Sequence, residues 1–416
     1  MNAALATLKE RGFFKQCTDE DLLNKKLDEG PIRIYVGVDP TGPSMHVGHM
    51  VPLFAMHHLQ QAGHLPTILV GGGTARIGDP SGKSDMRKML TIDQIKANAE
   101  NLKKQIANFI DFDGDKAKLV DNADWLADLN YIDFLREIGR HFSVNRMLTF
   151  EAYKKRMEKG LSFIEFNYQL LQSYDFLELY RRENCILQIG GDDQWGNIVA
   201  GMELIRRMEG SEAEAMGLTF PLVTRSDGKK MGKTEKGAIF LDPELTSIYE
   251  FFQYWRNVAD ADVEKFLLLY TFLPTDECRR LGALKDQEIN KAKEVLAYEL
   301  TKIIHGEAEA NKVMEGARAA FKAGGTQDKS GMPSGDMSVS ELEKGINIMD
   351  LFVKAGLCSS KSEARRLVSQ NGAAINGEKN SDVDAVISVE AIVDEGGEKE
   401  IVLKAGKKRF FRYIVK

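Results

Sequence analysis

Cysteine is scarce in this sequence, and the few cysteines form no pattern. The 416 residues include only four, and no two of them make a Cys-x-x-Cys pair: Cys17, Cys185, Cys278 and Cys358. This scarcity argues against a disulfide framework and against a structural zinc site, because both need clustered cysteines. We therefore expect reduced thiols and no protein-bound metal.

The sequence also lacks an apolar run of the roughly 18–20 residues that a membrane span needs. Its first residues, MNAALATLKERGFF, have neither the apolar core nor the cleavage site of a secretory signal peptide. The composition, 43% hydrophobic and 28% charged, is typical of a soluble globular protein. We expect a cytoplasmic protein with no membrane partner.

An overall excess of positive charge is missing as well, since the formal net charge is −6. The charge is nevertheless uneven along the chain. Residues 346–416 contain twelve Lys and Arg against ten Asp and Glu, and the final stretch, KAGKKRFFRYIVK, is clearly basic. Because nucleic-acid recognition depends on a local patch, an acidic protein with a basic terminal segment can still bind RNA there.

Strand and helix patterns alternate in the first half of the chain. The predicted strands cover residues 32–39, 66–72 and 185–191. One predicted helix begins after a turn at 41–45, and three others cover residues 91–109, 167–183 and 193–208. The strands are apolar on both faces, as in buried parallel sheets, and Thr91 with Gln94 forms a capping box. This order predicts an α/β fold with a doubly wound, Rossmann-like parallel sheet.

The second half of the chain predicts different structures. Residues 246–322 have a helical pattern with no strand candidate, and 323–340 are rich in Gly, Ser, Asp and Pro, which is typical of a linker. The remaining residues predict a small α+β unit with helices at 349–355 and 361–370. Its Asn376-Gly377 pair indicates a type I′ hairpin, and two further strands close the chain.

Two histidines, His46 and His49, lie in the stretch GVDPTGPSMHVGHM after a Pro-Thr-Gly-Pro turn. Residues three apart share a helix face, so both rings can reach one ligand at the helix N-terminus, where free N–H groups favour anions. Gly48 between them lets a flat ring or a phosphate lie against the backbone. Zinc is disfavoured because a third ligand is missing. Two partly exposed histidines without a ligand are the alternative.

Two other stretches carry lysines. RIGDPSGKS (76–84) fails the spacing of a phosphate-binding P-loop by one position, since Ile77 stands where the first glycine is needed. Lys83 can still approach a phosphate, and Asp79 is placed to meet an amine. In SDGKKMGKT (226–234), Lys230 and Lys233 can neutralise charge that builds up in a transition state. A solvated basic loop is the alternative for this stretch.

Together these motifs resemble a known family. A His-x-Gly-His turn followed about 180 residues later by Lys-Met-Gly-Lys-Thr is similar to the two signatures of class I aminoacyl-tRNA synthetases. The stretches YVGVDPTGPSMHVGH, IGDPSGK, FNYQLLQSYDF and IGGDDQWGNI follow, in order, the motif series of bacterial tyrosyl-tRNA synthetases. The terminal unit resembles a small RNA-binding motif first known from a ribosomal protein. The resemblance runs from about residue 30 to the end.

The resemblance implies that L-tyrosine is activated with ATP, accompanied by Mg²⁺, and is then transferred to the 3′-terminal adenosine of its tRNA. Because tyrosine's carboxylate is already anionic, catalysis requires positioning and charge stabilisation rather than a protein nucleophile. By resemblance, Thr41 and His46 reach the γ-phosphate, Lys83, Arg87, Lys230 and Lys233 neutralise pyrophosphate, and Asp39, Gly48, His49, Gly191 and Asp193 complete the ATP site.

The resemblance also assigns the amino-acid pocket. Tyr35 and Asp175 would bind the phenol, Asp79, Tyr168 and Gln172 the ammonium, and Gln194 the carboxylate. The helical spacing agrees, because Tyr168, Gln172 and Asp175 lie at i, i+4 and i+7 on one face. A core stripe with chance polar residues is disfavoured, since each buried polar group would need a partner.

Two positions depart from the pattern of some relatives. Val36 stands where some carry a cysteine that hydrogen-bonds near the ribose, which puts one ribose contact in doubt. Asp192 replaces a serine, so two adjacent carboxylates are available to the ribose, and we favour Asp193. The alternatives for the activity are a tryptophanyl-tRNA synthetase and a nucleotidyltransferase that does not use tRNA.

The resemblance further implies partners and domains. A homodimer with an interface near residues 131–145 is expected. Basic residues of the terminal unit are expected to bind RNA: Lys361, Arg365, Arg366, Lys407 and Lys408. Phe410, Phe411 and Tyr413 are possible stacking rings for RNA bases, and the alternative is that they belong to the unit's own small core. The predicted domains are 1–240 (catalytic, with an inserted dimerisation and acceptor-stem region), 241–324 (helical, anticodon-arm-binding), 325–345 (linker) and 346–416 (RNA-binding).

Overall fold

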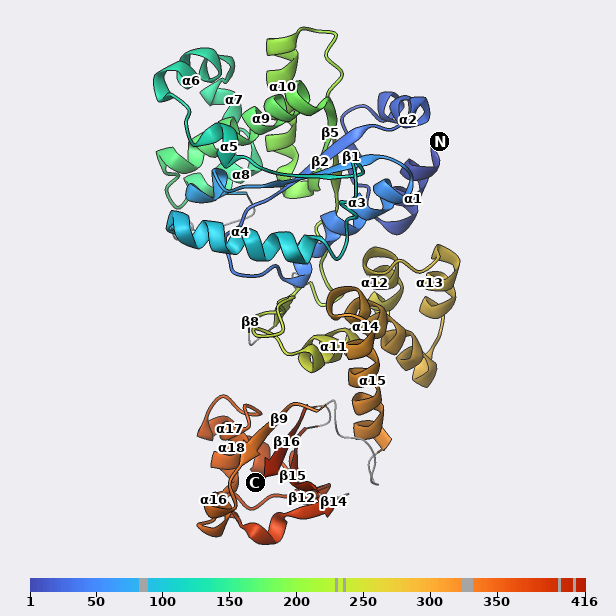
Figure 1. Cartoon of the computed structure of the whole chain (residues 1–416), viewed down its shortest axis with the longest axis vertical. Coiled ribbons are helices and arrows are strands. Elements are labelled where there is room, and N and C mark those ends of the chain that lie inside the picture. The colour runs from blue at the N-terminus through green and yellow to red at the C-terminus, as the bar shows by residue number, and fades with distance from the viewer. Residues whose placement is uncertain (82–88, 229–230, 235–236, 323–331, 396–397, 407–408) are drawn as a thin grey trace. The chain divides into compact units, whose positions relative to one another are not determined.

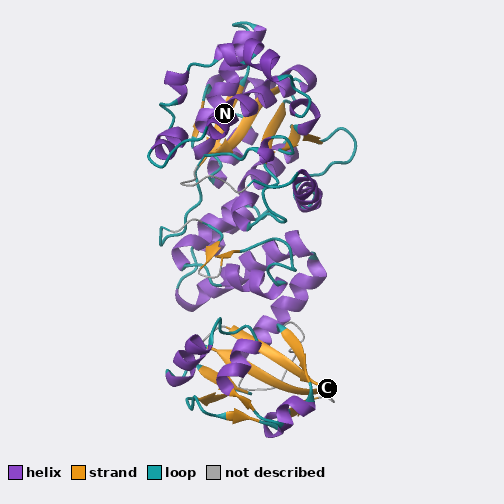
Figure 2. Cartoon of the chain, turned by 90° about the vertical axis from the view of Figure 1, so that its left-hand side faces the viewer, coloured by secondary structure: helices purple, strands orange, loops and turns teal. Residues whose placement is uncertain are grey.

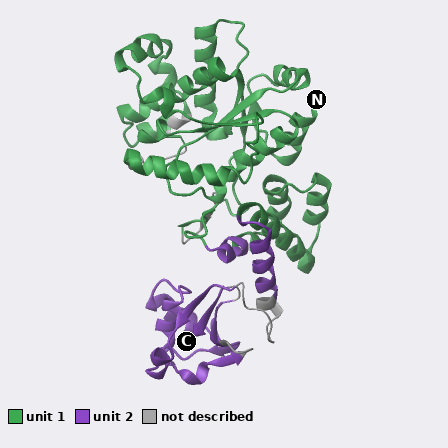
Figure 3. Cartoon of the chain, in the orientation of Figure 1, with its two compact units in different colours: residues 1–246, 254–304 green, residues 247–253, 305–416 purple. Residues whose placement is uncertain are grey.

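A computed structural model describes residues 1–81, 89–228, 231–234, 237–322, 332–395, 398–406 and 409–416. The chain groups into two compact units, one of residues 1–246 and 254–304 and the other of residues 247–253 and 305–416 (Figure 3). Within the described residues, no helix combines the length and the apolar character that crossing a membrane would require.

A twisted sheet with the strand order β1-β6-β5-β2-β3-β4 forms the centre of the first unit (Figure 1). Its strands are β1 (Gln16–Cys17), β2 (Arg33–Val38), β3 (Leu65–Val70), β4 (Lys118–Asp121), β5 (Cys185–Gly191) and β6 (Met216–Phe220). All neighbours pair in parallel except β1, which runs antiparallel to β6 at the edge. The predicted doubly wound parallel sheet is confirmed.

Helices cover both faces of this sheet. α9 (Phe163–Glu183) and α10 (Trp195–Glu209) pack against each other and against β5, and α3 (Met50–Gln61) packs against β3 and β5 from the opposite face (Figure 1). Ile34, Tyr35 and Val36 are therefore buried although they alternate in direction along β2. The three strands predicted from sequence form as β2, β3 and β5.

The sequence analysis did not identify β4 and β6. β4 is short and only partly buried, and β6, Met-Gly-Leu-Thr-Phe, contains a glycine that weakens a strand pattern. One predicted helix start is confirmed by its cap, whereas α9 begins at Phe163, four residues before the predicted residue 167. Thr91 and Gln94 form the expected capping box at α4 (Ile92–Ile106), and Ser162 with Glu165 forms another at α9.

The remaining helices of the first 246 residues are short or lie outside the sheet's centre. They are α1 (Ala3–Arg11), α2 (Glu20–Glu29), η1 (Val47–His49), η2 (Thr74–Arg76), α5 (Ala123–Leu126), α6 (Tyr131–Glu137), η3 (Gly139–His141), α7 (Val144–Met147), α8 (Glu151–Met157) and η4 (Asp192–Gln194). A two-stranded hairpin, β7 (Lys233–Thr234) with β8 (Gly237–Ala238), follows β6.

Helices alone follow this hairpin up to residue 322, as predicted (Figure 2). They are α11 (Ile248–Arg256), η5 (Asp260–Asp262), α12 (Val263–Tyr270), α13 (Thr275–Gly282), η6 (Asp286–Glu288), α14 (Ile289–His305) and α15 (Glu307–Lys322). Trp255, Phe266 and Tyr270 are fully buried in this region; Trp255 and Tyr270 each pack edge to face with Phe266 and are tilted by 58° relative to each other. Aromatic packing of this kind stabilises a small helical core.

The terminal residues form a second sheet, with β12-β11-β15-β16-β9 along its main path and β14 beside β15. Its elements are β9 (Ser334–Met337), α16 (Val339–Glu343), α17 (Ile348–Lys354), α18 (Lys361–Ser369), β11 (Ala373–Ile375), β12 (Glu378–Asn380), β14 (Val393–Glu395), β15 (Glu398–Ala405) and β16 (Arg409–Val415), with η7 (Val389–Ala391) and the separate pair β10 (Ile346–Asn347) and β13 (Val386–Ile387). Asn376 and Gly377 both have positive φ, which confirms the type I′ hairpin.

The terminal unit contradicts one prediction and favours one of the two alternatives for its aromatic residues. Residues 334–343 were assigned to the linker, but β9 pairs in parallel with β16 and α16 follows it, because Met337 and Leu342 are buried in the unit's core. Phe410 and Tyr413, proposed as stacking rings, are also buried, with exposed fractions of 8% and 2%. The aromatic side chains of β16 therefore contribute to the core.

Candidate active site

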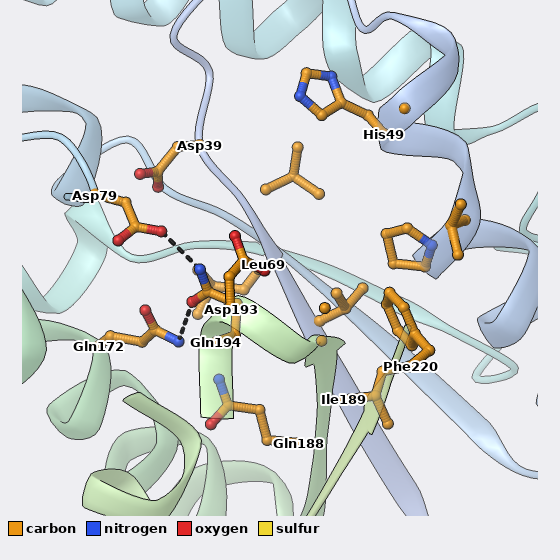
Figure 4. Close-up of a pocket in the computed structure, with 18 of the residues that line it drawn as sticks. Asp39, His49, Leu69, Asp79, Gln172, Gln188, Ile189, Asp193, Gln194 and Phe220 are labelled. Carbon is orange, nitrogen blue, oxygen red and sulfur yellow. Dashed lines mark hydrogen bonds between the residues drawn. The ribbon is translucent and has the colours of Figure 1, made fainter. Parts of the chain in front are cut away.

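A cavity of about 360 Å³ lies at the carboxyl ends of β2 and β5. In the sheet, β2 lies between β3 and β5, and the connections from β2 to β3 and from β4 to β5 lead to opposite sides of β2. The strand order therefore reverses between β2 and β5, and parallel α/β sheets bind ligands at such a point. Every residue predicted for the tyrosine and ATP sites whose side chain the structure describes lines this cavity: Tyr35, Asp39, Thr41, His46, Gly48, His49, Asp79, Tyr168, Gln172, Asp175, Gly191, Asp193 and Gln194. Figure 4 shows six of them: Asp39, His49, Asp79, Gln172, Asp193 and Gln194.

Several predicted basic residues lie outside the described residues. These are Lys83, Arg87 and Lys230 in the predicted ATP site and Lys407 and Lys408 in the terminal unit. The backbone of Lys233 is described, as the first residue of β7, but its side chain is not.

Tyr35 and Asp175 are the buried polar pair of the cavity. The Tyr35 hydroxyl is buried and has no hydrogen-bond partner among the described residues. Burial and the nearby Asp175 carboxylate raise the pKa of this phenol well above its usual value. Burial raises the pKa of Asp175 to about 8. A buried hydroxyl without a partner costs free energy, and a ligand that supplies the missing hydrogen bond would offset that cost.

Asp175 is held by two side chains that the sequence analysis missed. Asn122 Nδ2 donates to its Oδ2 at 2.9 Å and Trp125 Nε1 donates to its Oδ1 at 2.8 Å. Asn122 also donates to Thr74 Oγ1 at 2.9 Å, and its own Oδ1 accepts from the backbone N–H of Gly73 at 2.7 Å. These bonds fix the carboxylate and favour its charged form, which partly opposes the effect of burial.

The same network reaches the predicted nucleotide side of the cavity. Thr74 Oγ1 donates to Asp39 Oδ1 at 2.8 Å, and the Tyr168 hydroxyl donates to Asp39 Oδ2 at 2.9 Å. Tyr168 was assigned to the ammonium group with Asp79, but its hydroxyl is bound to Asp39 in this structure. Burial, followed by the Asp39 and Asp79 carboxylates, raises the pKa of Tyr168 well above its usual value, so the phenol stays protonated and donates.

A second network surrounds Asp79. Gln194 Nε2 donates to Asp79 Oδ2 at 2.8 Å, and Gln172 Nε2 donates to Gln194 Oε1 at 3.2 Å, as Figure 4 shows. Asn197 Nδ2 in turn donates to Gln172 Oε1 at 3.0 Å. Three of the four residues predicted to hold tyrosine's ammonium and carboxylate are thus brought together from the residue 76–81 turn, α9 and η4, with Asn197 of α10 behind them.

His46 and His49 cap the 3₁₀ turn that starts α3. The His46 Nδ1 accepts from the Gly48 backbone N–H at 3.1 Å, and the His49 Nδ1 accepts from the His46 backbone N–H at 3.3 Å. Because each Nδ1 is an acceptor, a neutral ring carries its proton on Nε2. The sequence predicted that free backbone N–H groups at this helix start would bind an anion. Two of these N–H groups are instead bonded to the imidazoles, so the two histidines offer their Nε2–H groups as donors to an anion.

Gly48 is required by close contacts. A Cβ at this position would lie 2.9 Å from His46 Cε1 and 3.4 Å from the Met231 carbonyl oxygen. Gly232, with φ of +80°, would similarly place a Cβ 2.7 Å from Val47 Cγ2. The His-x-Gly-His turn and the Met231-Gly232 segment are therefore packed against each other, although about 180 residues separate them in the sequence.

The two adjacent carboxylates have different surroundings. Asp192 Oδ1 accepts from Gln16 Nε2 at 2.9 Å and from Thr219 Oγ1 at 3.2 Å, so it joins β1 and β6 to the end of β5. Asp193 lines the cavity and Asp192 does not. Val36 also lines the cavity and is buried, where it can offer only apolar contact.

Among the described residues, no group of three His, Cys, Asp or Glu side chains could hold a metal ion. The residues that sequence analysis missed share one signal. Asn122 follows Asp121 at the end of β4, and Gln188 lies within β5 with a buried Oε1 that has no partner among the described residues. Polar residues inside or directly after apolar runs could have indicated both.

Comparison with known proteins decides the family. Residues 26–322 match the family model of class I tRNA synthetases (W and Y), and residues 326–413 match that of the tyrosine–tRNA ligase SYY-like C-terminal domain. The chain is 61% identical over 414 residues to the tyrosine–tRNA ligase of Treponema denticola, with both chains covered in full. The chain belongs to the tyrosine–tRNA ligase family. Its identity to the tyrosine–tRNA ligase of Treponema pallidum is 56%, covering 100% of this chain and 99% of the relative.

Solved structures of this family agree with the fold. A C-terminally truncated mitochondrial tyrosyl-tRNA synthetase of Aspergillus nidulans superposes with a TM-score of 0.69 at 31% identity, covering 77% of this chain and 95% of that one. A tryptophanyl-tRNA synthetase from Encephalitozoon cuniculi has a TM-score of 0.56 at 14% identity, covering 78% and 89%. At that identity only the fold is shared, so the tryptophan-specific alternative is not favoured.

Proposed function

We infer that the chain is a tyrosine–tRNA ligase that activates L-tyrosine with ATP and transfers it to tRNA. The observation that carries this inference is the buried Tyr35 hydroxyl, which has no hydrogen-bond partner in the described part of the chain and lies close to the Asp175 carboxylate. A phenol supplies both a donor and an acceptor to such a pair, whereas the indole of tryptophan supplies one donor only. Asp79, Gln172 and Gln194, which are linked by hydrogen bonds, offer the polar groups for the amino acid's ammonium and carboxylate.

For the activation step, we propose that His46 and Thr41 bind the γ-phosphate, while His49, Asp39, Gly48, Gly191 and Asp193 complete the nucleotide site. Lys83, Arg87, Lys230 and Lys233 would neutralise the leaving pyrophosphate. A Cβ on Gly191 would meet Asp193 Oδ1 at 2.7 Å, so this backbone stays open beside the carboxylate proposed for the ribose. No general base is needed, and the residues act by orientation and charge.

We further propose the finer assignments that the sequence suggested. Residues 241–324 would bind the anticodon arm, and the terminal domain would bind tRNA through exposed Arg365 and Arg366 of α18, with Lys361 beside them. Lys361 Nζ also lies 2.6 Å from Asp350 Oδ1, which lowers its expected contribution. Mg²⁺ would arrive with ATP, held by the phosphates.

A homodimer in the cytoplasm is also proposed. The segment 131–145 carries apolar side chains that are exposed in the single chain, with exposed fractions of 55% for Tyr131, 68% for Ile132 and 56% for Val144. Exposed apolar groups gathered in one segment are typical of an interface with another protein chain.

The experiment that tests the activity is ATP–pyrophosphate exchange measured with tyrosine, with tryptophan and without amino acid. We expect exchange with tyrosine alone. Exchange driven by tryptophan would contradict the assignment of Tyr35 and Asp175, and exchange without amino acid would indicate a different nucleotidyl transfer. Charging of bulk tRNA with labelled tyrosine then tests the second step.

A further inference from the structure

Residues 223–228 and 231–232, which lie before and within the Lys-Met-Gly-Lys-Thr motif, are attached to the helices that follow them at three points. The Gly232 backbone N–H donates to the Tyr254 hydroxyl at 3.1 Å, and that hydroxyl donates to Met231 Sδ at 3.4 Å. Tyr254 belongs to α11, which follows the catalytic region in sequence. One phenol thus holds both residues at the centre of the motif.

The second attachment is a buried carboxylate. Asp262, only 3% exposed, accepts from the Ser226 backbone N–H at 3.0 Å on both oxygens and from Ser226 Oγ at 2.9 Å. Asp262 occupies the N-cap position of α12 yet makes no side-chain cap bond to that helix. Its hydrogen-bonding capacity is directed to the segment instead of to its own helix, where capping would be the usual role.

The third attachment is Lys265, whose Nζ donates to the Thr224 carbonyl oxygen at 2.7 Å. On its other side the segment contacts the histidine turn. The Met231 carbonyl oxygen faces Gly48, the Gly232 carbonyl accepts from Ile239 N–H at 3.0 Å, and Val47 N–H donates to the Ile239 carbonyl at 3.0 Å. The backbone that carries Lys233 is therefore fixed between the histidine turn and the helices.

We propose that Tyr254 and Asp262 are positioning residues for adenylate formation: Tyr254 holds the Met231-Gly232 backbone and Asp262 holds Ser226 ahead of it, so that the lysine motif meets the ATP site. Neither residue lines the cavity, so we expect them to act through the lysine motif and not by contact with tyrosine or ATP. Their effect should appear in the rate of the chemical step and not in the binding of tyrosine, because charge stabilisation in the transition state depends on placement to within a fraction of an ångström. The inference rests on the proposed role of Lys233.

The test uses hydroxyl deletion in the full chain with a matched control. Tyr254→Phe removes the bond to Gly232 and keeps the ring. Tyr270→Phe removes a hydroxyl that is buried in the same helical region and has no partner among the described residues. We expect Tyr254→Phe to lower kcat of tyrosine-dependent pyrophosphate exchange about 3- to 10-fold, the effect of one hydrogen bond. KM for tyrosine should be unchanged, and Tyr270→Phe should match the wild type.

Asp262 gives an independent graded series. Asp262→Ala removes all three bonds and should lower kcat by more than 10-fold. Asp262→Asn keeps one acceptor oxygen and should recover part of that loss. Equal effects of Asp262→Ala and Asp262→Asn on kcat, or a rise in KM for tyrosine matching the fall in kcat, would overturn the proposal, as would unchanged kcat in Tyr254→Phe.

A double-mutant cycle separates this inference from the proposed function. If Tyr254 acts through the lysine motif, Tyr254→Phe should cost little once Lys233→Ala is present, since the effects are not additive. If Lys233→Ala is impaired and its effect on kcat simply adds to that of Tyr254→Phe, the positioning role of Tyr254 is overturned while the proposed role of Lys233 stands. Normal exchange in Lys233→Ala would overturn the proposed role of Lys233 and the inference with it.

Discussion

The imidazole rings of His46 and His49 stack with their centroids 3.7 Å apart and their planes 17° apart. Each Nδ1 accepts a backbone N–H of the same turn, so the pair is oriented before any ligand arrives. Such preorganisation lets a group act on developing charge without first rearranging.

We therefore expect His46→Ala to act mainly on the transition state. Loss of one positioned donor should lower kcat for adenylate formation on the order of 100-fold. Equilibrium dialysis with labelled tyrosine should give a Kd close to that of the wild type. Weakened ground-state binding of tyrosine would place this histidine in the amino-acid pocket instead.

Gly48→Ala tests the contact between the histidine turn and the Met231-Gly232 segment. The added methyl group would lie 2.9 Å from the His46 ring, so the ring or the segment must move. We expect at least a 10-fold loss of kcat for exchange, because a small misplacement near the reacting groups is costly. Gly42→Ala is the control, since its Cβ would meet only the Ser44 carbonyl at 3.9 Å. Equal activity of the two variants would contradict this account.

Discrimination against phenylalanine should depend on Tyr35 and Asp175. Sites built around a substrate hydroxyl can reject the analogue that lacks it by about 10⁴–10⁵-fold, because buried polar groups are left unpaired. Asp175→Ala should lose most kcat/KM for tyrosine, since it also leaves Asn122 and Trp125 without their acceptor. Tyr35→Phe should lose about 3- to 10-fold. Normal tyrosine activation with full exclusion of phenylalanine in Asp175→Ala would refute the assignment.

Asp175 should also make the free energy of unfolding depend on pH. Its folded pKa is raised to about 8 by burial, whereas an unfolded aspartate has a pKa of about 3.9. The folded state binds the proton more tightly, so this stabilisation is complete below about pH 4 and is lost as pH rises through about 8. Asp175→Asn cannot ionise. Urea unfolding from about pH 4 to pH 9 should show the wild type losing about 5 kcal/mol relative to Asp175→Asn, because each unit of pKa difference corresponds to about 1.4 kcal/mol. Parallel pH profiles of the two proteins would contradict this expectation.

Removing the terminal domain should separate the two reaction steps. A chain ending near residue 325 should keep tyrosine-dependent exchange and lose most tRNA charging at low tRNA concentration. In the full chain, Arg365→Ala or Arg366→Ala should each reduce the salt dependence of tRNA binding by a slope of about 1. Undiminished charging by the truncated chain would assign another role to this domain.

The sequence by itself predicted several local structures and most of the polar residues that line the cavity. Apolar runs bounded by turns predicted β2, β3 and β5, because burial on both faces leaves a pattern that needs no distant partner. The i, i+4, i+7 spacing placed Tyr168, Gln172 and Asp175 on one face of α9, and all three line the cavity. Resemblance to the synthetases supplied their proposed roles, which spacing alone does not give.

Only the tertiary structure decided which groups support that site. Asn122, Asp175 and Thr74 meet from three separate elements, and Asp192 is occupied by Gln16 from 176 residues away. Likewise, the composition of Ser334–Met337 predicted a linker, but these residues form β9 because they pair with β16. Local patterns report propensity and burial, whereas long-range hydrogen bonds depend on strand order and register, which bring together residues that no sequence window contains.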